Sequence, residues 1–545
     1  MRRTAWLLVA AAALAAGPGS APVAAQEKPP AGGPLGGNAD APAKPLAPEE
    51  KAAADRLFAE GMDLLKKDQY DLGRAKFQEI LRKYPGADED LLRECEDRGG
   101  KNCLVGIEEQ HHGGPPERRI DIELMGDGYT GDKFKGFAKI ARDQMVDFWA
   151  DPLYDEYENY FNVWRFDLIS EQDGVDEMSA ADKGIPPPEP DPRKRQKPSK
   201  PKKLKELQQY STALNCKAAG PANQVWADPE QVMRWRRYLK CSDGLTLAFA
   251  KKGQLGMGGG GIATTGVKVA VVHEFGHAFV GLLDEYVNNP SRPPGRICAA
   301  NAISTDDPDP RKPPPMDEIP WKHWLLLKDL KGMDIDVLPG GATYALGVFR
   351  PAKSCAMNAG GGGHYCWVCR EEGVRRIYSY LSPVDESGPA QDRVQVGAGE
   401  TKEFFVVPMA PKKHRIQVEW YLQRTATAAP TPKDPAAAAA DTSFVQDPGS
   451  DNGWQGDGPR LAARQSAPLP EGIPPGRLIK STVQPLGKTG IRSSVTLQKL
   501  DPGGWRLVAR VFDDTKVPGY SHPWVIKDLE RLREEWRTWD IEVPR

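Results

Sequence analysis

The sequence has almost no net charge. Its 73 lysine and arginine residues nearly match its 75 aspartate and glutamate residues, which leaves a formal net charge of -2. Such a chain has no overall electrostatic field that would attract nucleic acid or an anionic membrane. Residues 186–205 are rich in proline, lysine and arginine but have almost no side chains that would read bases, so a solvated loop is favoured over a binding patch. We therefore expect no nucleic-acid partner.

A long apolar run that could cross a membrane is also lacking. Residues 5–16 are apolar, but this run is too short for a bilayer and ends at Gly17-Pro-Gly. A basic start, a short apolar stretch and small residues before Gln26 are typical of a secretory signal. We predict a signal peptide over residues 1–25 and an exported protein, periplasmic or extracellular, with no stable membrane span after signal removal. An uncleaved membrane anchor is the alternative.

Cysteines are few, but their number, eight, is even. Export would place them where disulfides persist, so we expect disulfide bonds among them. The motif Cys366-Trp-Val-Cys369 alone would also suit half of a zinc site or a redox pair. A second such pair at ribbon spacing is missing from the sequence, so structural disulfides are favoured.

The chain is too long, at 545 residues, for one hydrophobic core. Composition and periodicity divide it into a signal peptide, a linker rich in Pro, Gly and Ala, a helical hairpin, a mixed α/β region and a β-rich region with a low-complexity insertion. The predicted boundaries, in that order, are 1–25, 26–47, 48–90, 115–383 and 384–545. Short alternating apolar segments separated by Gly and Pro make the last region typical of an immunoglobulin-like β-sandwich.

The predicted helical hairpin resembles a single tetratricopeptide unit. Apolar residues recur at helical spacing on both sides of a break at residues 68–70. Stacked arrays need about three repeats for stability, and the sequence has one. A hairpin that packs on its neighbour or acts as a spacer is therefore favoured over a peptide-binding array.

The mixed region begins with a β-α-β pattern. Residues 120–125 alternate as in a strand, residues 134–148 carry a helical apolar face, and residues 160–169 form the next strand. We expect these two strands to be parallel. Another short strand is predicted over residues 245–250. The glycine-rich residues 256–261 lack the Lys-Ser/Thr ending of a phosphate loop, so we interpret them as a flexible segment beside a cleft.

The motif His273-Glu-Phe-Gly-His277 is the strongest chemical signal. On a helix, residues four apart lie on one face about 6 Å apart along the axis, so both imidazoles can bind one zinc ion. Glu274 can reach a metal-bound water as general base. The alternative is a surface helix with two solvated histidines. The nearly all-apolar residues 267–272 argue against it, because buried polar groups require partners such as a metal.

A catalytic zinc ion usually has three protein ligands and one open position. In an unbroken helix Asp284 would lie about 10 Å beyond His277, too far for its short carboxylate. Gly281 can end the helix and turn the chain back, which would bring Asp284 to the metal. Glu285 would then point elsewhere, and we assign it a supporting role around the site.

Residues 273–286, His-Glu-Phe-Gly-His-Ala-Phe-Val-Gly-Leu-Leu-Asp-Glu-Tyr, resemble the signature of the IgA-peptidase family, a metzincin-like group of zinc metallopeptidases. In the commonest metzincin spacing, the glycine and the third ligand each come one residue earlier. Here Gly281 and Asp284 are both shifted by one residue, so the distance between them is the same. The resemblance spans about residues 119–381. Its other segments are residues 121–130, 160–164, 320–324, 349–351, 355–357 and 366–371.

The resemblance implies a methionine turn, in which Met357 forms the hydrophobic floor beneath the zinc ion. His364 lies in the glycine-rich loop nearby. It would be a fourth ligand, an oxyanion donor or an exposed side chain, and exposure is favoured. Tyr286 and Tyr365 are both candidates to stabilise a tetrahedral oxyanion, and their spacing favours neither.

The sequence thus predicts a multidomain protein with a metzincin-like α/β zinc-peptidase domain. The expected function is a secreted zinc-dependent endopeptidase that hydrolyses a protein or peptide substrate through water activated by one zinc ion, the one expected cofactor. Two alternatives are an exported binding protein with a zinc-stabilised fold and a metal-dependent hydrolase of a non-peptide amide. The sequence indicates no oligomeric state.

Overall fold

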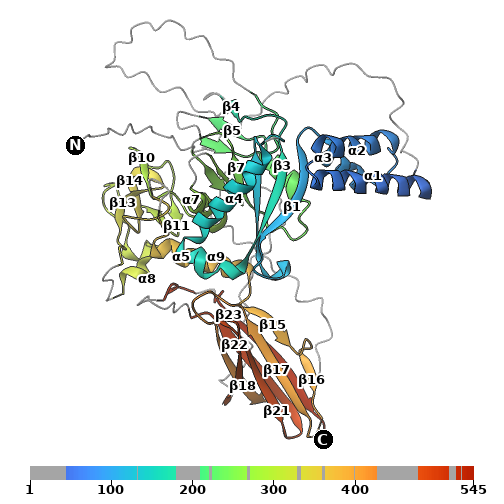
Figure 1. Ribbon diagram of the computed structural model, residues 1–545. Helices are drawn as coiled ribbons and strands as arrows, with labels where there is room; N and C mark the ends of the chain where they lie inside the picture. Colours follow the sequence, from blue (N-terminus) through green and yellow to red (C-terminus); the bar gives the residue numbers. More distant parts are fainter. Residues whose placement is uncertain are drawn as a thin grey trace, which may run out of the picture.

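The computed structural model describes most of the chain outside its N-terminus and two long insertions. The described residues are 45–131, 133–178, 209–219, 224–253, 255–266, 270–327, 333–358, 363–397, 399–425, 477–514, 523–528 and 531–545. The predicted signal peptide, most of the predicted linker and the insertion in the β-rich region lie outside them. Within the described part, no helix is both long enough and apolar enough to cross a membrane. The protein is a mixed α/β chain with several sheets (Figure 1).

In the described residues, three helices precede the first strand. They are α1 (Pro48–Lys66), α2 (Tyr70–Lys83) and α3 (Glu89–Gly99). Gly61 of α1 lies against the Phe77 ring of α2, where an added Cβ would be 2.8 Å from the ring. The glycine therefore allows the two helices to cross closely. The third helix extends beyond the end predicted at residue 90, and Figure 1 shows the three helices beside β1 (Cys103–His111).

The central sheet has the strand order β1-β3-β2-β7-β9-β8. Its other strands are β2 (Ile120–Asp127), β3 (Phe161–Ile169), β7 (Leu245–Ala250), β8 (Met257–Gly259) and β9 (Ile262–Thr265). The four inner strands are parallel, and β1 and β8 pair antiparallel at the two edges. As predicted, helix α4 (Phe134–Trp149) joins the parallel strands β2 and β3. The sheet begins at β1, before the boundary predicted at residue 115.

Both faces of the central sheet are covered. Ile122 and Leu124 of β2 pack on one face with Phe137 of α4 and Phe275 of α7 (Val271–Phe275). On the other face, Phe166 and other strand residues pack against α6 and a small sheet. The elements of that layer are β4 (Asp176–Met178), β5 (Lys217–Ala219), β6 (Gln224–Trp226) and α6 (Pro229–Arg236). Helix α7 packs against both β9 and α4, so the part of the histidine motif that it carries is buried.

The remaining elements of this region follow α7 or connect the layers. A second sheet has the order β10-β14-β12-β11, with β13 paired to β14. The bounds are η1 (Pro116–Arg118), α5 (Pro152–Glu156), η2 (Glu158–Tyr160), β10 (Val287–Asn289), β11 (Cys298–Ala299), β12 (Ala302–Ser304), η5 (Met316–Glu318), α8 (Lys322–Leu325), β13 (Leu338–Gly341), β14 (Thr343–Arg350) and α9 (Trp367–Tyr380). The chain that follows the histidine motif enters this sheet as β10, where pairing with β14 holds it in place.

The C-terminal region consists of two sheets with orders β15-β17-β21-β20 and β16-β23-β22-β18-β19. Phe404 of one sheet packs on Trp539 of the other, at 5.6 Å between ring centroids, and Trp420 stacks on the same indole. The sheets therefore pack face to face around these rings. The bounds are β15 (Val384–Gly388), β16 (Arg393–Gln395), β17 (Thr401–Pro408), β18 (Gln417–Arg424), β19 (Arg477–Ile479), β20 (Thr482–Leu486), β21 (Gly490–Gln498), β22 (Gly503–Phe512) and β23 (Glu534–Val543).

A buried ionic network joins the C-terminal sheets to the central region. His414 lies between two carboxylates, with Nδ1 2.8 Å from Glu156 Oε1 and Nε2 2.9 Å from Asp513 Oδ1. The hydroxyl groups of Tyr157 and Tyr378 donate to the other oxygen of Asp513. Burial opposes a charge on the imidazole, but the two carboxylates outweigh it and raise the pKa of His414 from 6.5 to about 10. We infer that His414 is a cation in the folded protein.

This network predicts a pH-dependent stability. The pKa of His414 is higher in the folded state, so its stabilisation is complete below about pH 6.5 and is lost as pH rises through about 10. Urea denaturation of the wild type at several pH values should show the free energy of unfolding falling over this window. The variant His414→Gln should be less stable and should lose most of that slope. The variant His112→Gln changes an exposed histidine and should keep it; equal slopes in all three proteins would contradict the prediction.

Candidate active site

The histidine motif lies on a short helix that rests on a buried methionine. Helix α7 continues as one π-helical turn, η4 (Gly276–Val280), a local form that is frequent at functional sites. A Cβ on Gly276 would lie 2.7 Å from Met357 Sδ and 2.8 Å from Tyr365 Oη. Only glycine fits where the helix contacts these two side chains. The helix therefore packs directly on Met357, which is fully buried. Met357 thus lies against the helix that carries both histidines.

Three ligand atoms from the predicted set converge. Nε2 of His273 lies 3.2 Å from Nε2 of His277, and the two nitrogens lie 3.1 and 3.2 Å from Oδ1 of Asp284. Tetrahedral zinc with bonds of about 2.0–2.1 Å places its ligand atoms about 3.3 Å apart. The three edges of this triangle therefore match one metal ion bound by all three residues.

Backbone carbonyls orient both imidazoles. Nδ1 of His273 lies 2.9 Å from the carbonyl oxygen of Ala356, and Nδ1 of His277 lies 2.6 Å from that of Leu282. Each Nδ1 therefore donates a hydrogen bond, which leaves the Nε2 lone pairs facing each other. Two such lone pairs repel unless a cation lies between them. The donor set is thus suited to a divalent metal.

Gly281 makes the reversal that brings Asp284 to the histidines. Its φ of 79° is left-handed, and the N–H of Leu282 donates to the carbonyl oxygen of Gly276 at 3.0 Å. The chain then reverses toward the histidines. The carbonyl oxygen of Asp284 accepts a hydrogen bond from the N–H of Ala342 at 2.6 Å. A residue with a Cβ is strained at this φ, so the turn favours glycine.

The charges at the three ligands reinforce one another. Burial would raise the pKa of Asp284, but hydrogen bonds from His273 and His277 lower it well below its usual range. Burial also opposes charge on the imidazoles, yet Asp284 raises the pKa of His273 and raises that of His277 to about 9. Asp284 is therefore a carboxylate that strongly favours a nearby cation, and protons compete with metal for this site at low pH.

Glu274 is buried beside the two histidines, and it offers a ligand or base atom within 4.8 Å of theirs. Burial raises the pKa of Glu274, although the neighbouring histidines partly offset this effect. A base with a raised pKa works closer to neutral pH than an ordinary carboxylate. The position suits a side chain that takes a proton from water next to the metal ligands.

The glycine-rich residues 256–261 have a different role from the flexible segment that we predicted. They form β8 and its turn into β9, and β8 lies against the histidine helix. A Cβ on Gly256 would be 2.7 Å from Glu274 Oε1, and one on Gly258 would overlap the carbonyl oxygen of Glu274 and lie 2.8 Å from Cβ of His277. The glycines therefore allow the strand to approach the histidine helix.

The two candidate oxyanion tyrosines lie in different environments. The Tyr286 ring stacks on His273 at 6.2 Å between centroids, and a hydrogen bond with Asp284 adds to burial in raising the pKa of Tyr286. Tyr365 is buried beneath the helix, where its hydroxyl donates to the carbonyl oxygen of Val272 at 2.6 Å. Of the two, Tyr286 is at the ligands and Tyr365 is a support for the helix.

His364 and Glu285 lie away from the three ligand atoms. The His364 side chain is exposed, with Nδ1 3.7 Å from Asp151 Oδ2, in keeping with the exposure that we favoured. Glu285 is fully buried and lies near the thiols of Cys366 and Cys369.

The expected disulfides are not formed: all eight cysteines lie in the described residues, and all are free. The sequence did not predict that Glu285 lies beside Cys366 and Cys369, because Glu285 is distant from them along the chain.

The close approach of β8 gives a matched pair of variants. Gly258→Ala should displace the helix that carries Glu274 and His277, and we expect a loss of metal affinity of about 10-fold or more. Gly259→Ala adds a Cβ that meets nothing within 4 Å and should bind metal as the wild type does. Zinc titration of the two apo variants measures the difference, and equal affinities would show that the approach of β8 has no effect on the ligands.

Comparison with known proteins found one family match, in the first part of the central sheet. A search of curated proteins found no match to the chain. Residues 108–184 match the family model described as IgA Peptidase M64. The matched segment covers the last four residues of β1 and all of β2, α4 and β3. The resemblance seen in the sequence is confirmed over this segment, which is similar to the IgA-peptidase family of zinc metallopeptidases and does not include the histidine motif.

Proposed function

We propose that the protein is an exported zinc-dependent endopeptidase with one catalytic zinc ion. The observation that carries the proposal is the convergence of two imidazole nitrogens and one carboxylate oxygen, 3.1 to 3.2 Å apart, beside the buried Glu274. In this proposal the region from β1 to α9 is a metzincin-like domain. The N-terminal helices are a tetratricopeptide-like spacer, and the C-terminal sheets are an immunoglobulin-like module that covers the domain.

His273, His277 and Asp284 would hold the zinc ion. When bound, zinc supplies Lewis-acid polarisation of the scissile carbonyl and lowers the pKa of water. Glu274 accepts the proton of the attacking water and then delivers it to the amine of the leaving peptide. Tyr286 donates a hydrogen bond to the carbonyl oxygen as negative charge develops there. The backbone carbonyls at Ala356 and Leu282 keep the imidazoles in the required orientation.

The edge strand β8 supports a peptide as substrate. It is the last strand in the order of the central sheet, and it touches the helix that carries Glu274 and His277. Met257 and Gly259 are exposed on it. An extended peptide can add to such an edge through backbone hydrogen bonds, which hold it in one direction irrespective of its sequence. This mode would place a peptide bond of the substrate near Glu274.

The first test replaces the proposed base. Glu274→Gln should reduce kcat/KM on a peptide library by about 10²- to 10⁴-fold, because the amide cannot accept the proton of water. The ligands are unchanged, so zinc content by mass spectrometry should stay at the wild-type value. Glu318→Gln alters an exposed residue and should keep full activity. Chelator should abolish wild-type cleavage, and undiminished hydrolysis by Glu274→Gln would remove this residue from the mechanism.

The second test distinguishes the two tyrosines. Tyr286→Phe should lower kcat by roughly 10², with little change in KM, because its hydroxyl would act on charge that appears only in the transition state. Tyr365→Phe removes the hydrogen bond to Val272 and should lower thermal stability, with kcat within a few-fold of the wild type. Steady-state kinetics and thermal melts measure both effects. A larger loss of kcat in Tyr365→Phe would reverse the assignment.

A further inference from the structure

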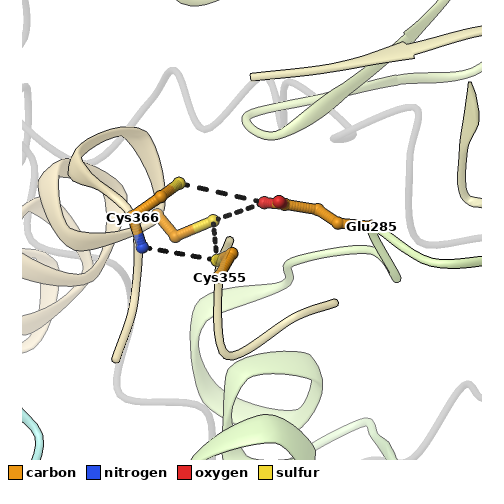
Figure 2. A group of neighbouring side chains, drawn as sticks. Glu285, Cys355 and Cys366 are labelled. Carbon is orange, nitrogen blue, oxygen red and sulfur yellow. Dashed lines mark hydrogen bonds between the residues drawn. The ribbon is translucent and has the colours of Figure 1, made fainter. Parts of the chain in front are cut away.

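Four potential metal ligands gather behind the proposed active site. They are the thiols of Cys355, Cys366 and Cys369 and the carboxylate of Glu285, whose ligand atoms all lie within 4.8 Å of one another. Figure 2 shows the Glu285 carboxylate pointing at the cysteine sulfurs, with Cys355 and Cys366 on adjacent segments. Glu285, Cys355 and Cys369 are buried, and Cys366 is half-buried. None of them is among the atoms that form the histidine site.

The spacing of these atoms suits one shared metal ion. Sγ of Cys355 lies 3.6 Å from Sγ of Cys369, which is far longer than the 2.05 Å or so of a disulfide bond. Oε1 of Glu285 lies 3.1 Å from Cys369 Sγ and 3.9 Å from Cys366 Sγ. A tetrahedral zinc ion with Zn–S bonds of about 2.3 Å holds its sulfurs about 3.8 Å apart. A small rearrangement of the side chains around an ion would therefore bring all four atoms into range.

The charge of Glu285 points to a cation independently of the thiols. Its side chain is fully buried, and Oε2 has no hydrogen-bond partner in the described part of the chain. The partners of Oε1 are the Asn301 amide and the weak thiol donors. A buried carboxylate with so little compensation is costly, and a metal ion would neutralise it.

We propose that these four residues form a second metal site, a closed Cys3Glu site for zinc, distinct from the histidine site. Three cysteines are an odd number, so a disulfide would leave one thiol and the buried carboxylate unpaired. One divalent ion would use all four groups and would release the three thiol protons on binding. Four protein ligands leave no open position, so the ion would be structural and not catalytic.

The second site would position the first one. Glu285 directly follows the ligand Asp284, and its N–H donates to the carbonyl oxygen of Met357 at 2.6 Å. Cys355 directly precedes Ala356, whose carbonyl oxygen accepts from Nδ1 of His273. Cys366 and Cys369 lie at the start of α9. A metal here would hold the third ligand, the carbonyl that orients His273 and the floor methionine in one rigid unit.

The test measures metal and thiols in the full chain purified under reducing conditions. We expect two zinc ions per chain and an X-ray absorption spectrum with zinc–sulfur distances of about 2.3 Å. Cobalt substitution should give a thiolate-to-cobalt charge-transfer band. Unfolding in chelator should expose eight free thiols, the number of cysteines in the chain. A spectrum without sulfur ligands, or a disulfide among the three cysteines, would overturn the proposal.

Variants separate the two sites. Cys366→Ser with Cys369→Ser should lower zinc from two ions to one per chain and remove the cobalt–thiolate band, whereas Cys298→Ser, at an exposed cysteine, should change neither. His273→Ala with His277→Ala should retain one zinc ion bound to sulfur. If the proposed peptidase site is wrong but this inference is right, the wild type will hold a single zinc ion with sulfur ligands. If the cysteine variants misfold, the X-ray absorption spectrum and the thiol count of the wild type still show whether zinc is bound by the cysteines.

Discussion

The hydrogen bond from the N–H of Glu285 to the carbonyl oxygen of Met357, at 2.6 Å, joins the two segments on which the site depends. One segment leaves the histidine helix through the left-handed turn at Gly281 and carries Asp284. The other passes beneath the helix and carries the carbonyl of Ala356, which orients His273. If the two segments separated, the third ligand and the support of the first imidazole would be lost together.

Small residues set the distances around this centre. Gly276 lets the helix rest on Met357 and Tyr365, and Gly256 and Gly258 let the edge strand approach from the other side. A methyl group at any of these positions would overlap a neighbour, so the helix is confined between strand and floor. Such confinement keeps the proposed ligand atoms close, although the histidine helix α7 is only a few residues long.

The C-terminal sheets contribute through a different kind of contact. His414 and Asp513 belong to that region, and they meet Glu156, Tyr157 and Tyr378 of the central region in a buried network. Helix α9 thus has Cys369 near its start and Tyr378 near its end. The proposed active site and the packing of the C-terminal sheets are connected through one helix, which gives those sheets a structural link to the metal ligands.

The sequence by itself determined the strands and helices with strong periodicity, including β2, α4, β3 and β7, because alternation and helical spacing are local properties. It also determined the spacing of His273 and His277, since one helical turn sets their separation. Only the tertiary structure decided that Gly256 and Gly258 pack on the histidine helix, and that Tyr286 and not Tyr365 lies at the proposed ligands. The gathering of Glu285 with three free cysteines, where we had expected disulfides, was decided in the same way. Each of these contacts joins residues from separate segments, and the distance between such residues is set by packing that no local pattern records.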